Sequence, residues 1–142
     1  MTIHDQSRRI FRENYIGSLA TVNHDGSPWS SPVHLVADDN YVYWLSMPDK
    51  QHSRNVARRA DVHVTLFSPD VARGLQGVYI SGRADHLPAG QQPHVFQLMC
   101  DRVGVENMPR GMEKTDAYRV PIGAPDVEKS TGNCWYFYSQ KD

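Results

Sequence analysis

The sequence lacks a long apolar run, a cysteine framework and a large excess of either charge. Its two cysteines, Cys100 and Cys134, form no CxxC pair, so we expect free packing thiols in a reducing, cytoplasmic setting. No stretch approaches membrane-spanning length, and residues 1–15 lack the apolar centre of a signal peptide. The net charge of −1 provides no general attraction to nucleic acid or to a membrane surface, and we expect neither as a partner.

Motifs of conventional catalytic and metal sites are also missing from the sequence. The seven histidines are scattered and form neither an HExxH pattern nor a Cys/His metal spacing, so we expect no metal centre. There is no nucleophile elbow, no Walker loop and no pair of carboxylates at a clear catalytic spacing. Such a sequence favours a protein whose chemistry is supplied by a cofactor.

What the sequence does contain is a series of short apolar strands separated by turns. A chain of 142 residues can hold one core, and we expect residues 1–142 to form a single domain. The pattern predicts short helices at about 3–15, 53–60 and 93–103, and about seven strands at 16–22, 29–37, 41–46, 61–67, 77–85, 117–122 and 134–139. We therefore expect a mainly β (α+β) fold, a closed or partly closed antiparallel barrel that leaves no free edges.

Alternation along the strands predicts that bulky aromatic side chains face outward at three positions, Trp44, Trp135 and Phe137. A monomeric barrel has no need of exposed residues of this size. A second copy of the chain would cover them, which favours a homodimer.

The stretch MPDKQHSRNV, residues 47–56, places three basic side chains at the junction of an aromatic strand and a short helix. Lys50, His52 and Arg54 alternate there. One interpretation is a solvated helix start that Asp49 caps. The other is an anion site, because a helix start offers unpaired N–H groups and a partial positive charge.

An ordered series of segments carries a family resemblance. LATVNHDGSPWSSPVHLVADDNYVYWLS, then KQHSRNVARRADVHVTL, then GVYISGRA resembles the pyridoxamine 5′-phosphate oxidase-like FMN-binding split β-barrel family. The resemblance covers residues 16–85 best. It implies a split β-barrel of about six to eight strands and a homodimer with FMN in a groove at the dimer interface.

The resemblance also implies which residues contact FMN. The basic stretch would hold the phosphate, and many family members carry Lys where this chain has His52. The second strand would run along the flavin ring, the third strand would flank it, and a residue of the last strand would cover it from the partner subunit. The residues matched in this way are Lys50, Gln51, His52 and Asn55 for the phosphate, Ser30, Ser31, Pro32, Val33 and His34 along the ring, Trp44 and Leu45 beside it, and Trp135 from the partner.

The last strand, CWYFYSQKD, lacks the Arg-rich ending with which true pyridoxamine phosphate oxidases hold their substrate, so we do not expect that reaction. The resemblance favours an FMN-dependent oxidoreductase that passes electrons or hydride between a nicotinamide donor and an unassigned small molecule. Arg83, Arg119 and Tyr79 are candidates for the open side of the flavin.

Three alternatives stay open on the sequence. The chain could be a deazaflavin-dependent reductase, or a haem-binding or haem-degrading split barrel with His34 or His52 as the iron ligand. It could also be a flavin-binding dimer without catalytic activity. The loops at 104–115 and 123–133 have no assigned role.

Overall fold

The computed structural model describes residues 3–68, 70–125 and 134–139. Ten strands, three α-helices and three short 3₁₀ helices lie in this part of the chain. In chain order they are α1 (Ile3–Glu13), β1 (Ile16–Val22), β2 (Pro28–His34), β3 (Val36–Ala37), β4 (Tyr41–Ser46), α2 (Gln51–Arg58), β5 (Asp61–Ser68), η1 (Val71–Arg73), β6 (Gln76–Arg83), β7 (Asp85–Leu87), α3 (Pro93–Val103), η2 (Val105–Asn107), η3 (Met112–Lys114), β8 (Asp116–Pro121), β9 (Ala124–Pro125) and β10 (Cys134–Ser139).

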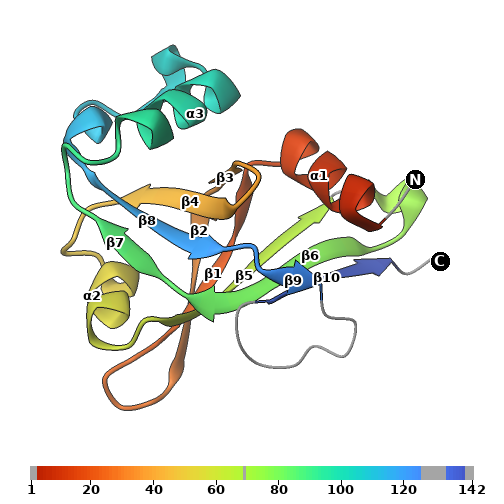
Figure 1. Ribbon diagram of the computed structural model, residues 1–142, viewed down its shortest axis with the longest axis horizontal. Helices are drawn as coiled ribbons and strands as arrows, with labels where there is room; N and C mark the ends of the chain where they lie inside the picture. The colour runs from red at the N-terminus through yellow and green to blue at the C-terminus, as the bar shows by residue number, and fades with distance from the viewer. Residues whose placement is uncertain (1–2, 69, 126–133, 140–142) are drawn as a thin grey trace.

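The strands form two sheets, as Figure 1 shows. The larger sheet has the order β2-β1-β5-β6-β10-β9 and the smaller one β3-β4-β8-β7. All pairs are antiparallel except β9 with β10. The predicted mainly β, split-barrel fold is confirmed. The expectation of no free edges is wrong, because the described strands make two separate sheets in which β2, β9, β3 and β7 are edges.

Two apolar clusters hold the two sheets and the helices together. The larger cluster lies between the sheets and takes Ile10 from α1 and Val56 from α2, both buried among strand residues. The smaller cluster joins Tyr43 of β4 to Val95 and Met99 of α3. Strand β4 is therefore buried on both faces. For this reason the alternation of its residues did not show which side chains face solvent.

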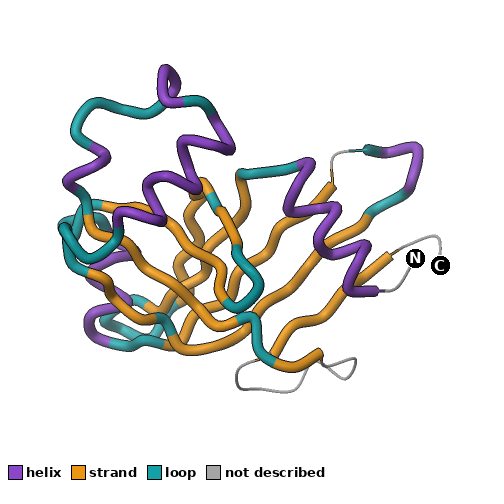
Figure 2. The backbone as a smooth tube through the Cα atoms, turned by 45° about the horizontal axis from the view of Figure 1, so that its top comes forward, coloured by secondary structure: helices purple, strands orange, loops and turns teal. Residues whose placement is uncertain are grey.

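The helices lie at two places around the barrel. Helices α1 and α3 lie on the same side of the strands in both views, and α2 lies at one end (Figures 1 and 2). Arg102 of α3 donates to the backbone oxygen of Phe11, which ties α3 to α1. No helix in the described ranges is long and apolar enough to cross a membrane.

Most predicted element boundaries agree with the structure. The strands at 16–22, 41–46 and 134–139 are confirmed residue for residue, and Gly104, with φ 86°, ends α3 as predicted. The strand predicted at 29–37 is broken at Leu35, whose N–H donates to the backbone oxygen of Tyr15 instead of to a strand partner. Helix α2 begins at Gln51, two residues before the predicted start.

The outer face of the six-stranded sheet has no described helix packed on it. Its residues are half-buried at the centre, where Ser18, Ala20, His63, Thr65 and Tyr79 lie side by side. Both apolar clusters, the larger and the smaller, lie on the other side of this sheet or beyond it.

Candidate functional site

A cavity of about 380 Å³ lies where β2, the end of β4 and the start of α2 meet the loop that follows α3. That volume is within the usual range for small-molecule pockets. Half of the sequence-predicted contact residues line it, although they come from three separate segments. These are Pro32, Val33 and His34 of β2, Leu45 of β4, and Lys50 and His52 at the start of α2.

The start of α2 provides the positive end of the cavity. Lys50 occupies the N-cap position with extended backbone angles, and its side chain makes no capping hydrogen bond. The first turn contains no acidic residue. The interpretation in which Asp49 caps this helix is therefore wrong. The first N–H groups of α2 keep their partial positive charge, to which the Lys50 ammonium adds.

His52 is held by a short chain of hydroxyl groups. Its Nε2 lies 2.8 Å from Oγ of Ser46, and Ser53 donates to the same oxygen at 3.0 Å. Burial lowers the pKa of His52 below 6.5, and the nearby Lys50 charge lowers it further. His52 is therefore neutral at pH 7 in the absence of an anion.

Asn55 and Gln51, both predicted to contact phosphate, have other roles in the structure. Asn55 is fully buried, and its amide donates to Oγ1 of Thr21 at 3.0 Å and to Oδ1 of Asn23 at 2.9 Å. Its own oxygen accepts from Gln51 at 2.9 Å and from Arg58 at 3.2 Å. These bonds attach α2 to the start of the β1–β2 turn, and neither Asn55 nor Gln51 lines the cavity.

The predicted ring contacts on β2 divide into two groups. Pro32, Val33 and His34 line the cavity, and His34 packs edge-on against the ring of Tyr15. Ser30 and Ser31 lie further along the same strand, where Ser30 bonds to Ser18 and Ser31 accepts from the indole of Trp29. Because β2 is an edge strand, the backbone groups on its outer side have no strand partner among the described residues.

The aromatic residues were placed incorrectly by the sequence pattern. Trp44 has no exposed surface and stacks on Tyr118 inside the larger cluster, and Phe137 is 8% exposed in the same cluster. The prediction that these two face outward is wrong, so they give no support for a dimer. Trp135 belongs to β10, but its side chain lies outside the described residues.

The three candidates for the open side of a flavin do not lie at the cavity. Arg83 pairs with Asp61 at 3.2 Å. Arg119 pairs with Asp85 at 3.1 Å and covers the ring of Tyr41. Tyr79 lies on the outer sheet face.

Sequence reasoning missed the apolar wall of the cavity. Ser46 and Met47 follow Leu45 directly in the chain, so the sequence could have predicted these two as cavity residues. The remaining wall residues come from α3 and the loop after it, which no local pattern connects to the basic stretch. They are Met99, Met108, Pro109 and Met112, with Ile16 at the start of β1.

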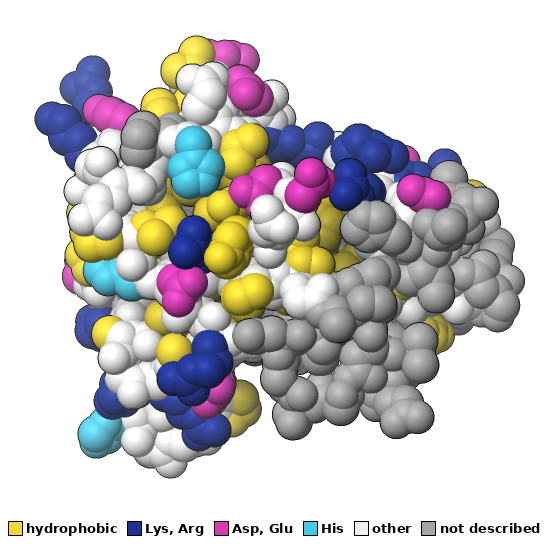
Figure 3. Space-filling view, viewed as in Figure 1, with side chains coloured by type: hydrophobic (Ala, Val, Ile, Leu, Met, Phe, Trp, Pro, Cys, Tyr) yellow, Lys and Arg dark blue, Asp and Glu magenta, His cyan; other side chains and the backbone are white. Residues whose placement is uncertain are grey.

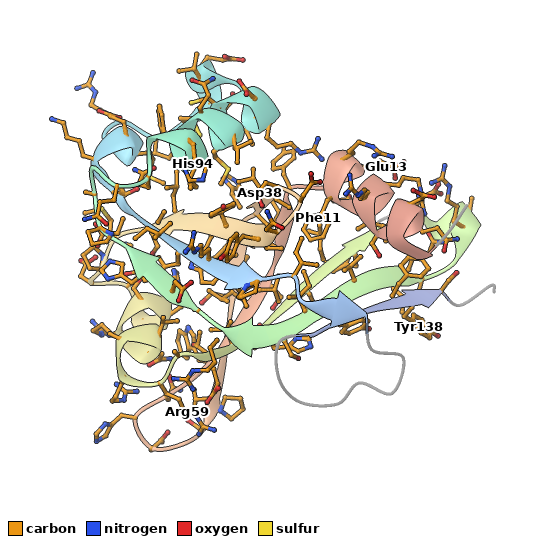
Figure 4. The ribbon with its side chains drawn as sticks, viewed as in Figure 1. Phe11, Glu13, Asp38, Arg59, His94 and Tyr138 are labelled. Carbon is orange, nitrogen blue, oxygen red and sulfur yellow. The ribbon has the colours of Figure 1, made fainter. Side chains whose placement is uncertain are left out.

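A second groove, of about 390 Å³, lies between α1, β3 and α3. Figure 4 shows Phe11 and Asp38 on its two sides. Its charged side chains are of both signs, three basic and three acidic. Arg8 pairs with Asp39 at 2.9 Å, and Asp38 accepts from the Tyr43 hydroxyl at 2.7 Å. Figure 3 shows basic and acidic side chains next to each other over α1. This balance makes the groove a weaker candidate than the basic cavity.

No group of three or more His, Cys, Asp or Glu side chains in the described part of the chain is arranged to hold a metal ion. The cavity therefore has to be explained by its single lysine, its helix start and its apolar walls.

Comparison with known families decides the identity of the fold. The family model described as pyridoxamine 5′-phosphate oxidase matches residues 3–122. The chain belongs to this family. The match includes every described residue of the cavity, from Ile16 to Met112. No curated protein matches the chain.

Solved structures of the split-barrel fold agree with this assignment. An F420 reductase is similar at a TM-score of 0.67 and 19% identity, over 82% of this chain and 93% of that one. The haem storage protein HutZ from Vibrio cholerae is similar at 0.71 and 16%, over 88% and 93%. A haem-binding protein from Mycobacterium smegmatis is similar at 0.70 and 17%, over 84% of this chain and 50% of that one. At these identities the likeness establishes the fold alone.

Proposed function

We propose that the cavity beside α2 binds FMN, with the phosphate at the basic end and the flavin ring along β2. The observation that carries this proposal is the convergence of Lys50, an uncapped helix start and the edge of β2 on one cavity. A phosphate dianion accepts from helix N–H groups and from an ammonium group. The polar edge of the ring accepts and donates hydrogen bonds that the free backbone of β2 can supply.

His52 takes a defined part in this proposal. It is neutral without a ligand, because it is buried and close to Lys50. A phosphate placed beside it favours the charged form and raises its pKa. Binding of FMN is therefore accompanied by proton uptake at His52 around neutral pH. The hydrogen bond to Ser46 keeps the imidazole ring of His52 oriented.

The reaction that follows from this site is a redox reaction. Bound FMN supplies hydride or electron transfer, and the chain supplies position and a partly dry environment. We propose an oxidoreductase that takes electrons from a nicotinamide donor. The described residues that line the cavity include no carboxylate, so they offer no carboxylate acid–base pair.

We further propose that two copies of the chain pack through the outer face of the six-stranded sheet. Small and half-buried side chains such as Ala20 and Thr65 permit close approach of a second sheet there. Pro32 and His34 line the cavity and are exposed on β2, the edge strand of that same sheet. A second copy would narrow the cavity there.

Haem binding is the second candidate, and two histidines carry it. His34 and His52 both line the cavity, and a lowered pKa leaves His52 in the neutral form that binds iron. Beyond Lys50 and the two histidines, no titratable side chain among the described cavity residues distinguishes FMN from haem.

Titration of the purified protein with FMN and, separately, with haemin tests the proposal. We expect quenched flavin fluorescence at one equivalent per chain, and loss of flavin absorbance when NADPH or NADH is added without oxygen. Free flavin fluorescence that is unchanged by the protein would refute FMN binding. A Soret band that disappears in the His34→Ala or His52→Ala variant would establish the haem alternative in its place.

A further inference from the structure

The methionines of this chain gather at the cavity. The sequence has five methionines, and four of them, Met47, Met99, Met108 and Met112, line this one cavity. They come from the turn after β4, from α3 and from the loop after α3. Methionine is flexible and polarisable, adapts to differently shaped partners, and makes favourable contacts between its sulfur and aromatic rings.

The loop after α3, which carries Met108 and Met112, has a defined backbone conformation that hydrogen bonds support. Gly104 begins this loop and Gly111 lies within it, just before Met112. Both have φ 86°, a backbone conformation that other residues rarely adopt. Gln92, which is buried, donates to the backbone oxygen of Thr115 at 2.9 Å, and the Thr115 hydroxyl donates to that of Met112 at 2.8 Å. The wall that Met108 and Met112 form is therefore held in place against the barrel.

Charge is distributed unevenly around the cavity. Its cation, Lys50, and its half-buried histidine, His52, lie at the α2 end, and its other histidine, His34, lies on β2. The residues that α3 and the loop contribute are three methionines and Pro109, and the charged residues of that loop do not line the cavity. The methionine end therefore offers no group that would hold a phosphate or a carboxylate.

We propose that the methionine wall, formed by Met47, Met99, Met108 and Met112, binds a planar, apolar aromatic molecule without a phosphate group. This molecule is the substrate that is reduced: the nicotinamide donor gives two electrons to FMN, and these pass with two protons to the substrate, which leaves FMN oxidised. The inference rests on the proposed function, which places FMN at the basic end of the same cavity. It makes the loop between Gly104 and Thr115 the element that determines substrate specificity.

The test uses protein labelled with ¹³C at the methionine methyl groups, saturated with FMN and titrated with 2-naphthol. We expect upfield ring-current shifts of the Met108 and Met112 methyl signals. Pyridoxine 5′-phosphate, a polar phosphorylated aromatic, should leave these signals unchanged at the same concentration. Signals that do not respond to 2-naphthol, or that respond equally to the phosphorylated compound, would overturn the proposal.

Two matched double variants separate apolar binding from mere packing. Met108→Gln with Met112→Gln keeps the length of both side chains and should weaken 2-naphthol binding about tenfold, because it places amides in the wall. Met108→Leu with Met112→Leu keeps the wall apolar and should retain the affinity. Val105→Gln, on the same loop but 67% exposed and outside the cavity, is the control. Equal loss in the Gln and Leu variants would overturn the proposal.

Flavin fluorescence in the same samples keeps the two claims apart. If FMN does not bind, the proposed function fails, and the ring-current shifts are then measured on the flavin-free protein. If FMN binds while 2-naphthol does not shift the methionine signals, only the substrate proposal fails.

Discussion

Gly17 lies where the packing leaves no room for a side chain. A Cβ atom built there lies 2.6 Å from Cδ1 of Leu35 and 2.6 Å from the backbone oxygen of Thr65. Gly77, on β6 of the same sheet, has its nearest such neighbour at 3.4 Å, an ordinary contact. The difference comes from the backbone oxygen of Thr65 together with the Leu35 side chain, which both lie against Gly17.

We expect Gly17→Ala to lower the free energy of unfolding by about 1–3 kcal/mol, because the methyl group overpacks the core. Gly77→Ala is the matched control and should cost much less. Urea denaturation of both variants measures the difference. Equal losses would show that backbone freedom, rather than space at Gly17, determines the effect.

Asn55 shows the limit of prediction for a single residue. The family resemblance matched it to the phosphate of FMN, and the structure buries it in a network with Thr21 and Asn23. Those partners are more than thirty residues away in the chain. No local pattern could pair them. Lys50 lies at the N-cap of α2 and lines the cavity, and its contact with a phosphate stays a prediction.

At the scale of the element, α2 has a helix start that is unfavourable for stability and favourable for an anion. Lys50 stands at the N-cap, where Asp, Asn, Ser and Thr are preferred, and makes no capping bond. Lys50→Asp should therefore raise the free energy of unfolding by about 1 kcal/mol. The same change should abolish FMN binding, because a carboxylate replaces the ammonium group beside the phosphate.

Urea denaturation and FMN titration of the same preparation measure these two opposite effects. Lys50→Ala is the control, since it removes the charge without providing a cap. Stability and affinity that change in the same direction in Lys50→Asp would contradict this account of α2.

For some elements the sequence predicted both the position and the buried face, and for others only the position. Isolated amphipathic segments such as β5, with Val62, Val64 and Leu66 buried, were predicted in both position and facing. Strand β4 was predicted in position only. Its Trp44 side, expected to face solvent, lies in the larger cluster between the sheets, and α3 covers the opposite side at Tyr43. The loop after α3 could not be assigned, since its role depends on contacts with β2 and α2 that are distant in sequence.

At the scale of the whole molecule, two half-buried histidines make stability depend on pH. Burial lowers the pKa of His63 and, together with Lys50, that of His52, both from 6.5. The folded state therefore binds fewer protons than the unfolded state just below pH 6.5. The free energy of unfolding should be highest above that pH and fall as the pH drops through 6.5 toward the lower, folded-state values.

Urea denaturation between pH 7.5 and 5.5 measures this slope, with both limits set about one unit from the ordinary histidine pKa. We expect His63→Gln and His52→Gln each to make the slope shallower. A stability that is constant or rises toward pH 5.5 would exclude this effect of burial.

The oligomeric state is the second property of the whole molecule. Ala20 lies half-buried at the centre of the outer sheet face, opposite Ser30 on one side and His63 on the other. We expect a homodimer in sedimentation, and we expect Ala20→Arg to give a folded monomer that binds FMN more weakly. Ala89→Arg, on an exposed turn, should leave the dimer intact. A wild-type monomer in the presence of FMN would refute this interface.

The central claim is that the start of α2 binds the phosphate of FMN, and comparing FMN with riboflavin tests it most directly. Riboflavin carries the same ring without the phosphate. We expect the wild-type protein to bind FMN at least about tenfold more tightly than riboflavin, a difference of about 1.4 kcal/mol. In Lys50→Ala the affinity for FMN should fall toward that for riboflavin, while riboflavin binding stays the same. Equal affinities for the two compounds in the wild-type protein, or an equal loss of both in Lys50→Ala, would contradict the account.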